Sequence, residues 1–134
     1  MAGWQAALGC TLLVPSGPAP KMHLHVVVLG PVVIDGYGST PQVALVSVTS
    51  QQAGLPFDNA CTLARGEHEF VERDSFVSYR HLRIDSKAHA ERMVADKVWH
   101  PHVPCTAALL NRIMAGVCAS RFTNGEYRRL FDCA

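Results

Sequence analysis

Two histidines and a cysteine lie close together in the segment WHPHVPC, residues 99–105. His100, His102 and Cys105 offer nitrogen and thiolate ligands of the kind that zinc and copper accept. Candidates for a fourth ligand are His89, Cys118 and Cys133. The sequence has no second paired cluster at a recognised zinc spacing. We therefore favour a proline-rich loop that leads into a helix, and we expect neither a metal nor a cofactor.

A second concentration of chemically active side chains is CTLARGEHEFVERDSFVSYRHLRI, residues 61–84, which has two histidines and four arginines. It is patterned like two strands around a turn, so it builds either a site or a surface. His68 either bonds backbone carbonyls in the turn or contacts a phosphate or another part of a substrate. Tyr79 and Arg80 either stack on a base and clamp a phosphate, or belong to the core and its rim.

The alternation of side chains along residues 74–84 predicts the two faces of this strand. One face is expected to carry Val77, Tyr79 and His81, and the other Phe76, Ser78, Arg80 and Leu82.

His23 and His25 alternate with other residues at the start of HLHVVVL, residues 23–29. Alternate residues of a strand share one face, so the two imidazoles are expected to lie side by side. Imidazole titrates near neutral pH and can transfer protons. A solvated face or a hydrogen-bonded pair with no catalytic role is the alternative, and the pattern leaves both open.

The elements that must position these groups are mostly strands. Runs rich in β-branched residues at 23–29 and 41–49 predict two central strands, with a glycine-rich turn at 35–38 between them. Short strands at 61–63 and 74–84 follow. Several short strands in succession predict a small twisted sheet or a barrel.

The last third of the chain changes to helical periodicity. Apolar residues recur at helical spacing over residues 106–120, with Thr106 as the expected N-cap. Thr123 and Glu126 have the spacing of a capping box, which predicts a short final helix. Residues 86–100 fit either a helix or a strand.

Composition limits the class of protein. The 134 residues suit one domain, for which we expect residues 21–134, after a flexible N-terminal extension over residues 1–20. A net charge of +1 excludes a protein that coats nucleic acid, and no apolar run is long enough to span a membrane. Five widely spaced cysteines predict reduced thiols and a cytoplasmic protein.

The order of several motifs resembles a known family. A strand that begins with histidine is followed by VTS at residues 48–50, GEHEFV at 66–71, DSFVSYR at 74–80 and a helix ending in Ala-Ser. Over residues 21–122 this order resembles small bacterial proteins of the PemK/MazF-like toxin superfamily. The resemblance implies a mainly β fold, namely an SH3-like antiparallel barrel closed by a C-terminal amphipathic helix. It also implies a homodimer, an antitoxin-like protein partner and metal-independent cleavage of single-stranded RNA.

The resemblance assigns roles to particular residues. Attack by a ribose 2′-hydroxyl requires a cation at the phosphate, a hydroxyl donor and a proton-transfer group. Thr49 matches the hydroxyl position of the family, and Lys21, His23 and His25 stand where the family has an arginine. The expected substrate contacts are Ser50, His68, Tyr79 and Arg80. A non-catalytic relative that binds a protein partner or nucleic acid in the same groove is the alternative function.

Overall fold

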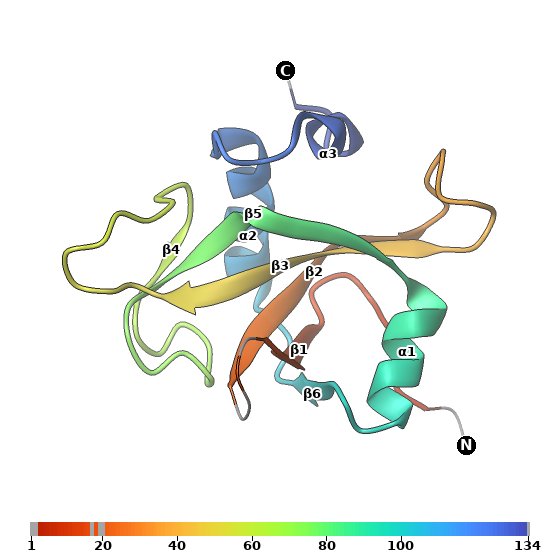
Figure 1. Cartoon of the computed structure of the whole chain (residues 1–134), viewed down its shortest axis with the longest axis horizontal. Coiled ribbons are helices and arrows are strands. Elements are labelled where there is room, and N and C mark those ends of the chain that lie inside the picture. The colour runs from red at the N-terminus through yellow and green to blue at the C-terminus, as the bar shows by residue number, and fades with distance from the viewer. Residues whose placement is uncertain (1–2, 17, 19–20, 134) are drawn as a thin grey trace.

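The computed structural model describes residues 3–16, 18 and 21–133. Its centre is one antiparallel sheet of six strands in the order β4-β5-β3-β2-β1-β6 (Figure 1). The strands are β1 (Thr11–Pro15), β2 (Met22–Val32), β3 (Gln42–Ser50), β4 (Thr62–Leu63), β5 (Ser75–Ser86) and β6 (His100–His102). The helices are α1 (Lys87–Ala95), α2 (Ala107–Ala119) and α3 (Gly125–Leu130). The protein is therefore mainly β, with two of its three helices at the C-terminal end, as the sequence predicted.

The sheet is open. The short strands β4 and β6 lie at opposite ends of the strand order, and no pairing joins them within the described residues. The predicted barrel is therefore not confirmed. Alternation along a strand predicts which side chains are buried, but it does not distinguish an open sheet from a closed one.

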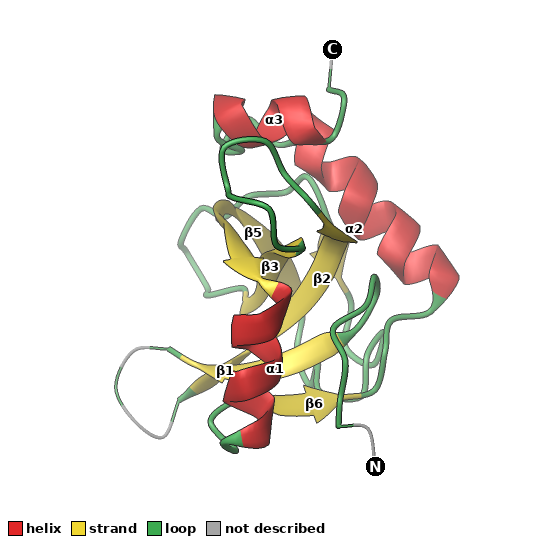
Figure 2. Cartoon of the chain, turned by 90° about the vertical axis from the view of Figure 1, so that its right-hand side faces the viewer, coloured by secondary structure: helices red, strands yellow, loops and turns green. Residues whose placement is uncertain are grey.

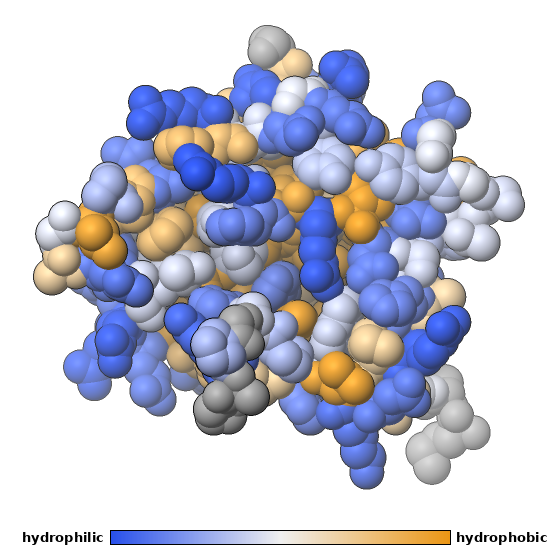
Figure 3. Space-filling model, viewed as in Figure 1, coloured by the Kyte–Doolittle hydropathy of each residue, from blue (hydrophilic) through white to orange (hydrophobic). Residues whose placement is uncertain are grey.

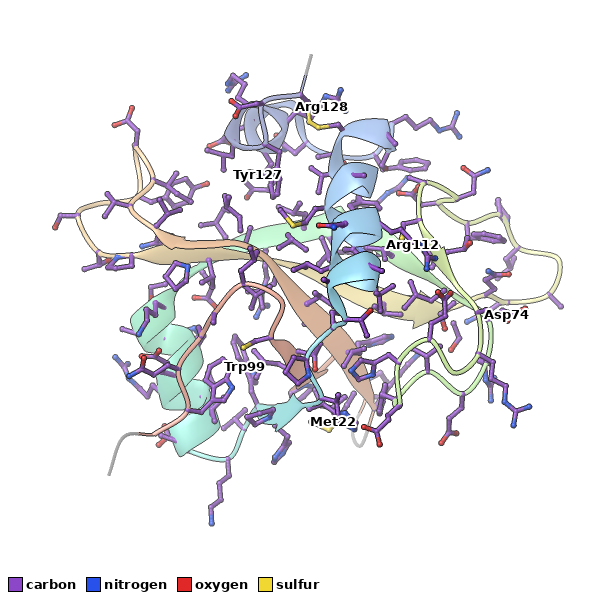
Figure 4. All side chains as sticks on the ribbon, turned by 180° about the vertical axis from the view of Figure 1, so that it is seen from behind. Met22, Asp74, Trp99, Arg112, Tyr127 and Arg128 are labelled. Carbon is purple, nitrogen blue, oxygen red and sulfur yellow. A yellow bond between two sulfur atoms is a disulfide. The ribbon has the colours of Figure 1, made fainter. Side chains whose placement is uncertain are left out.

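Each face of the sheet has its own core. The side chains of Leu24, Val46 and Tyr79 pack with α2 on one face. Val27 and Leu45 pack on the other face with Trp99 and the buried Ala90 of α1. The long helix α2 lies behind the sheet in Figure 1 and in front of it in Figure 4. Helix α1 follows the right-hand end of β5 in Figure 1 and lies in front of the strands in Figure 2.

The helix predictions are confirmed with one change. Thr106 is the N-cap of α2, and its hydroxyl accepts a hydrogen bond from Leu109 N at 3.2 Å. The final helix α3 exists, but its N-cap is Asn124 rather than Thr123. Thr123 is buried and its hydroxyl donates instead to the Val117 carbonyl at 2.7 Å. Residues 86–100, for which helix and strand were both open, form α1 with Ser86 as its N-cap and then reach β6.

The N-terminal segment differs from the expected flexible extension. Strand β1 pairs with β2 on one side and with β6 on the other, and Leu12 is fully buried. The segment PSGPAP, residues 15–20, connects β1 and β2 instead of separating the segment from the domain. Residues 1–2, 17, 19 and 20 of the predicted extension lie outside the described residues.

The cysteines also differ from the prediction of reduced thiols. Cys118 in α2 and Cys133 after α3 form a disulfide with a Cα–Cα distance of 5.3 Å. Cys10, Cys61 and Cys105 are free thiols. The chain turns back after α2, so that α3 brings Cys133 next to Cys118. The spacing of the cysteines in the sequence does not predict this turn. Within the described residues, no helix has both the length and the apolar character needed to cross a membrane.

Candidate functional site

Two histidines of β2 open onto the sheet face opposite α2. Leu24 and Val26 point into the α2 core, so the alternation of the strand turns His23 and His25 to the other face, as the sequence predicted. His23 is half-buried, and His25 is buried at 8% exposure.

Polar side chains on the neighbouring strands extend from these two histidines across the same face of the sheet. His25 pairs with Ser47 of β3, and Ser47 pairs with Ser78 of β5. Ser78 Oγ is hydrogen-bonded to Nδ1 of the exposed His81 at 2.6 Å. His25, Ser47 and Ser78 therefore form a row across β2, β3 and β5, and His81 joins its end through Ser78.

A slip in β5 brings His81 to this face. Between the pairs Leu45–Arg83 and Ser47–Ser78 the chain advances two residues along β3 but five along β5. Tyr79 and Leu82 both pack in the α2 core, and His81 lies with Ser78 on the opposite face. The predicted alternation, which placed His81 beside Tyr79 and Leu82 beside Ser78, is therefore wrong beyond Tyr79. Extra residues on one strand reverse the faces after them.

The row forms part of a groove of about 480 Å³, which we call the histidine groove. Its lining residues are Ser16, His23, His25, Ser47, Thr49, His81 and Arg83. Among these residues there are three imidazoles, a guanidinium group and three hydroxyl groups, and none is a carboxylate. Figure 3 shows this face, on which hydrophilic side chains lie among hydrophobic ones over the middle of the sheet. Arg83 is the one permanent cation among these lining residues, and it also forms an ion pair with Asp85 at 3.7 Å. The imidazole and hydroxyl groups add hydrogen-bonding capacity for an anion.

A smaller hollow of about 270 Å³ adjoins the histidine groove at His23 and Thr49, which line both. Lys21 and Ser50 line this hollow. The structure thus brings together all four residues that the resemblance made catalytic, and adds the predicted substrate contact Ser50.

The environment of His25 keeps its imidazole neutral. Burial lowers the pKa of His25 to about 4, and the nearby positive charges of Arg83 and His23 act in the same direction. A hydrogen bond to the His23 carbonyl opposes this effect, at 3.2 Å from Nδ1. Since a carbonyl only accepts, Nδ1 carries the hydrogen and Nε2 has a free lone pair.

His23 is perturbed in the same direction. Burial lowers the pKa of His23, and the positive charges of Lys21 and His81 lower it further. Its Nδ1 is hydrogen-bonded to the Ser16 hydroxyl, which holds the ring in place. Because His23 is more exposed than His25, its imidazole is the better placed of the two to meet a ligand.

Two predicted substrate contacts have structural roles. Tyr79 is fully buried, and its hydroxyl donates to the Ile113 carbonyl of α2 at 2.6 Å, so its ring presents no face to a base. His68 is 5% exposed, with Nε2 hydrogen-bonded to the Val103 carbonyl at 2.6 Å and Nδ1 accepting from Phe70 N at 3.0 Å. With both nitrogens engaged, His68 joins the turn to the loop before α2 and has no nitrogen left for a substrate.

The turn that contains His68 is also fixed by charge. Arg112 of α2, labelled in Figure 4, forms an ion pair with Glu67 and donates to the Thr62 carbonyl at 2.7 Å. The bonds from Arg112 hold the pKa of Glu67 below its usual range. Glu67 therefore attaches the β4–β5 connection to α2. Arg80 differs, because it is exposed and lines a separate pocket beside the histidine groove.

The segment with His100, His102 and Cys105 forms β6 and the loop that follows. His102 Nδ1 accepts a hydrogen bond from Val103 N at 2.9 Å. Among the described residues, no three histidine, cysteine or acidic side chains are grouped so that they could hold a metal ion.

Sequence reasoning missed Ser16, Ser47, His81 and Arg83 as members of the groove. Ser47 could have been predicted from the sequence, because Ser47 precedes Thr49 by two residues and therefore shares a strand face with Thr49. Ser16 was hidden by the expectation of a flexible extension, and His81 and Arg83 by the slip in β5.

No family model, curated protein or solved structure matches this chain. Functional reasoning therefore depends on the histidine groove itself. The groove offers imidazoles as proton-transfer groups beside the guanidinium of Arg83, with Lys21 in the adjoining hollow. Such groups can support acid–base chemistry on an anionic substrate.

Proposed function

We propose that the protein is a metal-independent endoribonuclease that acts on single-stranded RNA in the histidine groove. The observation that carries this proposal is the lining of the groove, where three imidazoles lie with Arg83 and no carboxylate. Cleavage through the ribose 2′-hydroxyl needs a proton acceptor, a proton donor and a cation at the phosphate, and such a lining contains all three. A divalent metal ion in this role prefers carboxylate and other oxygen ligands, which a lining of imidazoles does not favour.

In this proposal His23 accepts the proton of the 2′-hydroxyl. The low pKa of His25 excludes it from that role, because a group with a pKa of about 4 is a weak base at neutral pH. His25 instead acts as a positioning residue, since its Nδ1 bonds the carbonyl of His23. The exposed His81 donates a proton to the leaving 5′-oxygen.

The remaining groups act on the phosphate. Arg83 and Lys21 neutralise charge that develops on the non-bridging oxygens, and the Thr49 hydroxyl donates a hydrogen bond to one of them. In the reaction the 2′-oxygen forms a bond to phosphorus and the bond from phosphorus to the 5′-oxygen breaks. The products are a 2′,3′-cyclic phosphate and a free 5′-hydroxyl.

The biological part of the proposal comes from the resemblance to PemK/MazF-like toxins. It makes the protein a toxin with an SH3-like fold, which an antitoxin-like protein inhibits. A groove rich in imidazole and guanidinium groups would suit an acidic segment of such an inhibitor.

Cleavage of single-stranded RNA in the presence of EDTA tests the proposal. We expect wild-type protein to cleave, and His23→Ala and Thr49→Ala each to lose about 100-fold or more in rate, because each removes a group that acts on the transition state. His100→Ala is the matched control, since His100 is an exposed histidine outside the groove, and its rate should equal that of the wild type.

Absence of cleavage by wild-type protein over RNAs of varied sequence, with no growth arrest on induced expression, would overturn the proposal. The second candidate, a non-catalytic module that binds a protein or nucleic acid in the same groove, would then stand. It is favoured by the exposed apolar side chains of Leu55 and Phe57, at 58% and 38% exposure, in the loop before β4. Neither lines the histidine groove, so a partner that covers them would extend beyond the groove.

A further inference from the structure

A second pocket lies beside the histidine groove and has a different character. It has a volume of about 530 Å³ and is lined by Pro56, Phe57, Asp58, Phe76, Ser78, Arg80, His81, Arg121 and Phe122. Three phenylalanine rings and two guanidinium groups thus surround one hollow. We call it the aromatic pocket.

Two of its rings pack against each other and are partly exposed to solvent. Phe57 and Phe76 have ring centroids 5.4 Å apart and planes inclined by 30°. Phe57 is 38% exposed and Phe76 is half-buried. An exposed aromatic pair is an unusual surface in water, because its apolar area remains uncovered. A flat ligand could cover it by stacking.

The third ring is combined with positive charge. The guanidinium carbon of Arg80 lies 4.5 Å from the centroid of the Phe122 ring, and that of Arg121 lies 4.9 Å from it. Contacts of this kind orient the guanidinium groups and leave their N–H donors available to an anion. Apolar stacking and anion binding therefore occur within one pocket.

Hydrogen bonds after α2 fix the position of Phe122. Ser120, the C-cap of α2, donates from its hydroxyl to Asp58 at 2.6 Å and accepts from Phe122 N at 3.1 Å. Asp58 also accepts from Ala60 N at 3.0 Å, which ties the loop that carries Phe57 to the same point. The pocket is thus organised before any ligand binds, which reduces the entropy cost of binding.

His81 and Ser78 connect this pocket to the proposed catalytic groove. His81 lines both hollows, and its Nδ1 is bonded to Ser78, which lines the aromatic pocket. We infer that the aromatic pocket binds the base of a nucleotide adjacent to the scissile phosphate, with Arg80 and Arg121 on the next phosphate of the strand. This inference rests on the proposed function, since it places a base next to the group that protonates the leaving oxygen.

A nucleobase fits this combination better than a peptide side chain or a free anion. A nucleotide can stack its base on the exposed ring of Phe57, which Phe76 backs, and bring a phosphate to the arginines, so one nucleotide uses both features. An inorganic anion would leave the rings uncovered. An aliphatic side chain would leave the two guanidinium groups without an anion.

The test measures binding of an oligonucleotide that cannot be cleaved. Short single strands with 2′-O-methyl ribose are compared with abasic strands of the same length and charge, by fluorescence anisotropy. We expect wild-type protein to prefer the base-containing strand, and Phe57→Ala to weaken that binding by at least about fivefold because stacking is lost. Binding of the abasic strand should not change. Leu55→Ala is the control, because Leu55 lies in the same loop and is more exposed than Phe57 but does not line the pocket. This variant should bind as the wild type does.

A second variant tests the phosphate contact. Arg121→Gln should weaken binding of both strands, and the loss should diminish at high salt. Equal affinity of wild type and Phe57→Ala for the base-containing strand would overturn the base pocket, even if RNA is cleaved. A preference for bases that Phe57→Ala abolishes would support it even if wild type cleaves no RNA, so the two proposals fail separately. No binding of either strand by wild type would overturn the inference.

Discussion

His25 is the residue whose protonation bears most directly on stability. The folded protein takes up a proton at His25 only near pH 4, whereas the unfolded chain does so near pH 6.5. The unfolded state therefore binds more protons between these values, and the free energy of unfolding should decrease as the pH is lowered from about 6.5 to about 4. The shift corresponds to about 3 kcal/mol. His23 should add to the effect, because its pKa is also lowered.

Urea denaturation at several pH values between 7 and 4 measures this effect. His25→Gln keeps a polar side chain but no longer titrates, so the decrease in stability on acidification should be smaller than in the wild type. His100→Gln, at an exposed position, should keep the wild-type dependence. An identical pH dependence in wild type and His25→Gln would show that His25 is not held neutral by burial.

At the scale of elements, the contact between β5 and α2 holds the sheet against its main helix. Gly116 of α2 lies against the ring of Tyr79, and a Cβ atom at position 116 would overlap the Tyr79 hydroxyl. That hydroxyl is fixed by its bond to Ile113 O. The glycine therefore permits the close approach of strand and helix.

Gly116→Ala should destabilise the protein by about 1–3 kcal/mol, although alanine favours a helix, because the added methyl group has no room. Gly125→Ala is the matched control, since position 125 begins α3 in open space, and its effect should be neutral or slightly stabilising. Thermal or urea denaturation of both variants provides the comparison. Equal stability of the two would mean that Tyr79 can move aside.

The same contact explains a limit of the sequence analysis. Tyr79 and Arg80 were both predicted substrate contacts, and only the packing of α2 separates their roles. Tyr79 faces α2, whereas Arg80, in the slipped part of β5, lies over Phe122. Composition and strand alternation cannot predict where α2 packs, because α2 begins about 30 residues further along the chain.

At the scale of the whole molecule, the disulfide between Cys118 and Cys133 attaches α3 to α2. The two cysteines are 15 residues apart, and closing a loop of that length stabilises the folded state by about 3 kcal/mol. Reduction with dithiothreitol should therefore lower the melting temperature. The double variant Cys118→Ala/Cys133→Ala should melt at a lower temperature than the oxidised wild type and show no response to the reductant. A wild-type melting temperature that does not change on reduction would contradict a stabilising disulfide.

The proposed toxin-like assembly is a homodimer. Strand β4 pairs only with Ser75 and Phe76 of β5, so within the described residues the rest of β5 has no strand partner on that side. A second subunit is one way to cover the backbone groups of such an edge. Light scattering at micromolar concentration should give twice the mass of one chain. A monomer under these conditions would remove the dimer from the proposal and leave the histidine groove unaffected.

The sequence by itself determined the elements that local patterns encode. Runs of β-branched residues over 23–29 and 41–49, with a glycine-rich turn between them, predicted β2 and β3, and helical spacing with the Thr106 cap predicted α2. It also placed His23 and His25 on one face. These features depend on side chains only a few residues apart, whose preference for strand or helix is the same wherever the segment lies.

Only the tertiary structure decided which groups join those histidines. The slip of β5 against β3 turned His81 and Arg83 to the histidine groove, and the pairing of β1 with β2 brought in Ser16. The disulfide and the open sheet likewise depend on segments distant in the sequence. Such features follow from the packing of whole elements, because a register is set by the partner strand and by the core that both strands share.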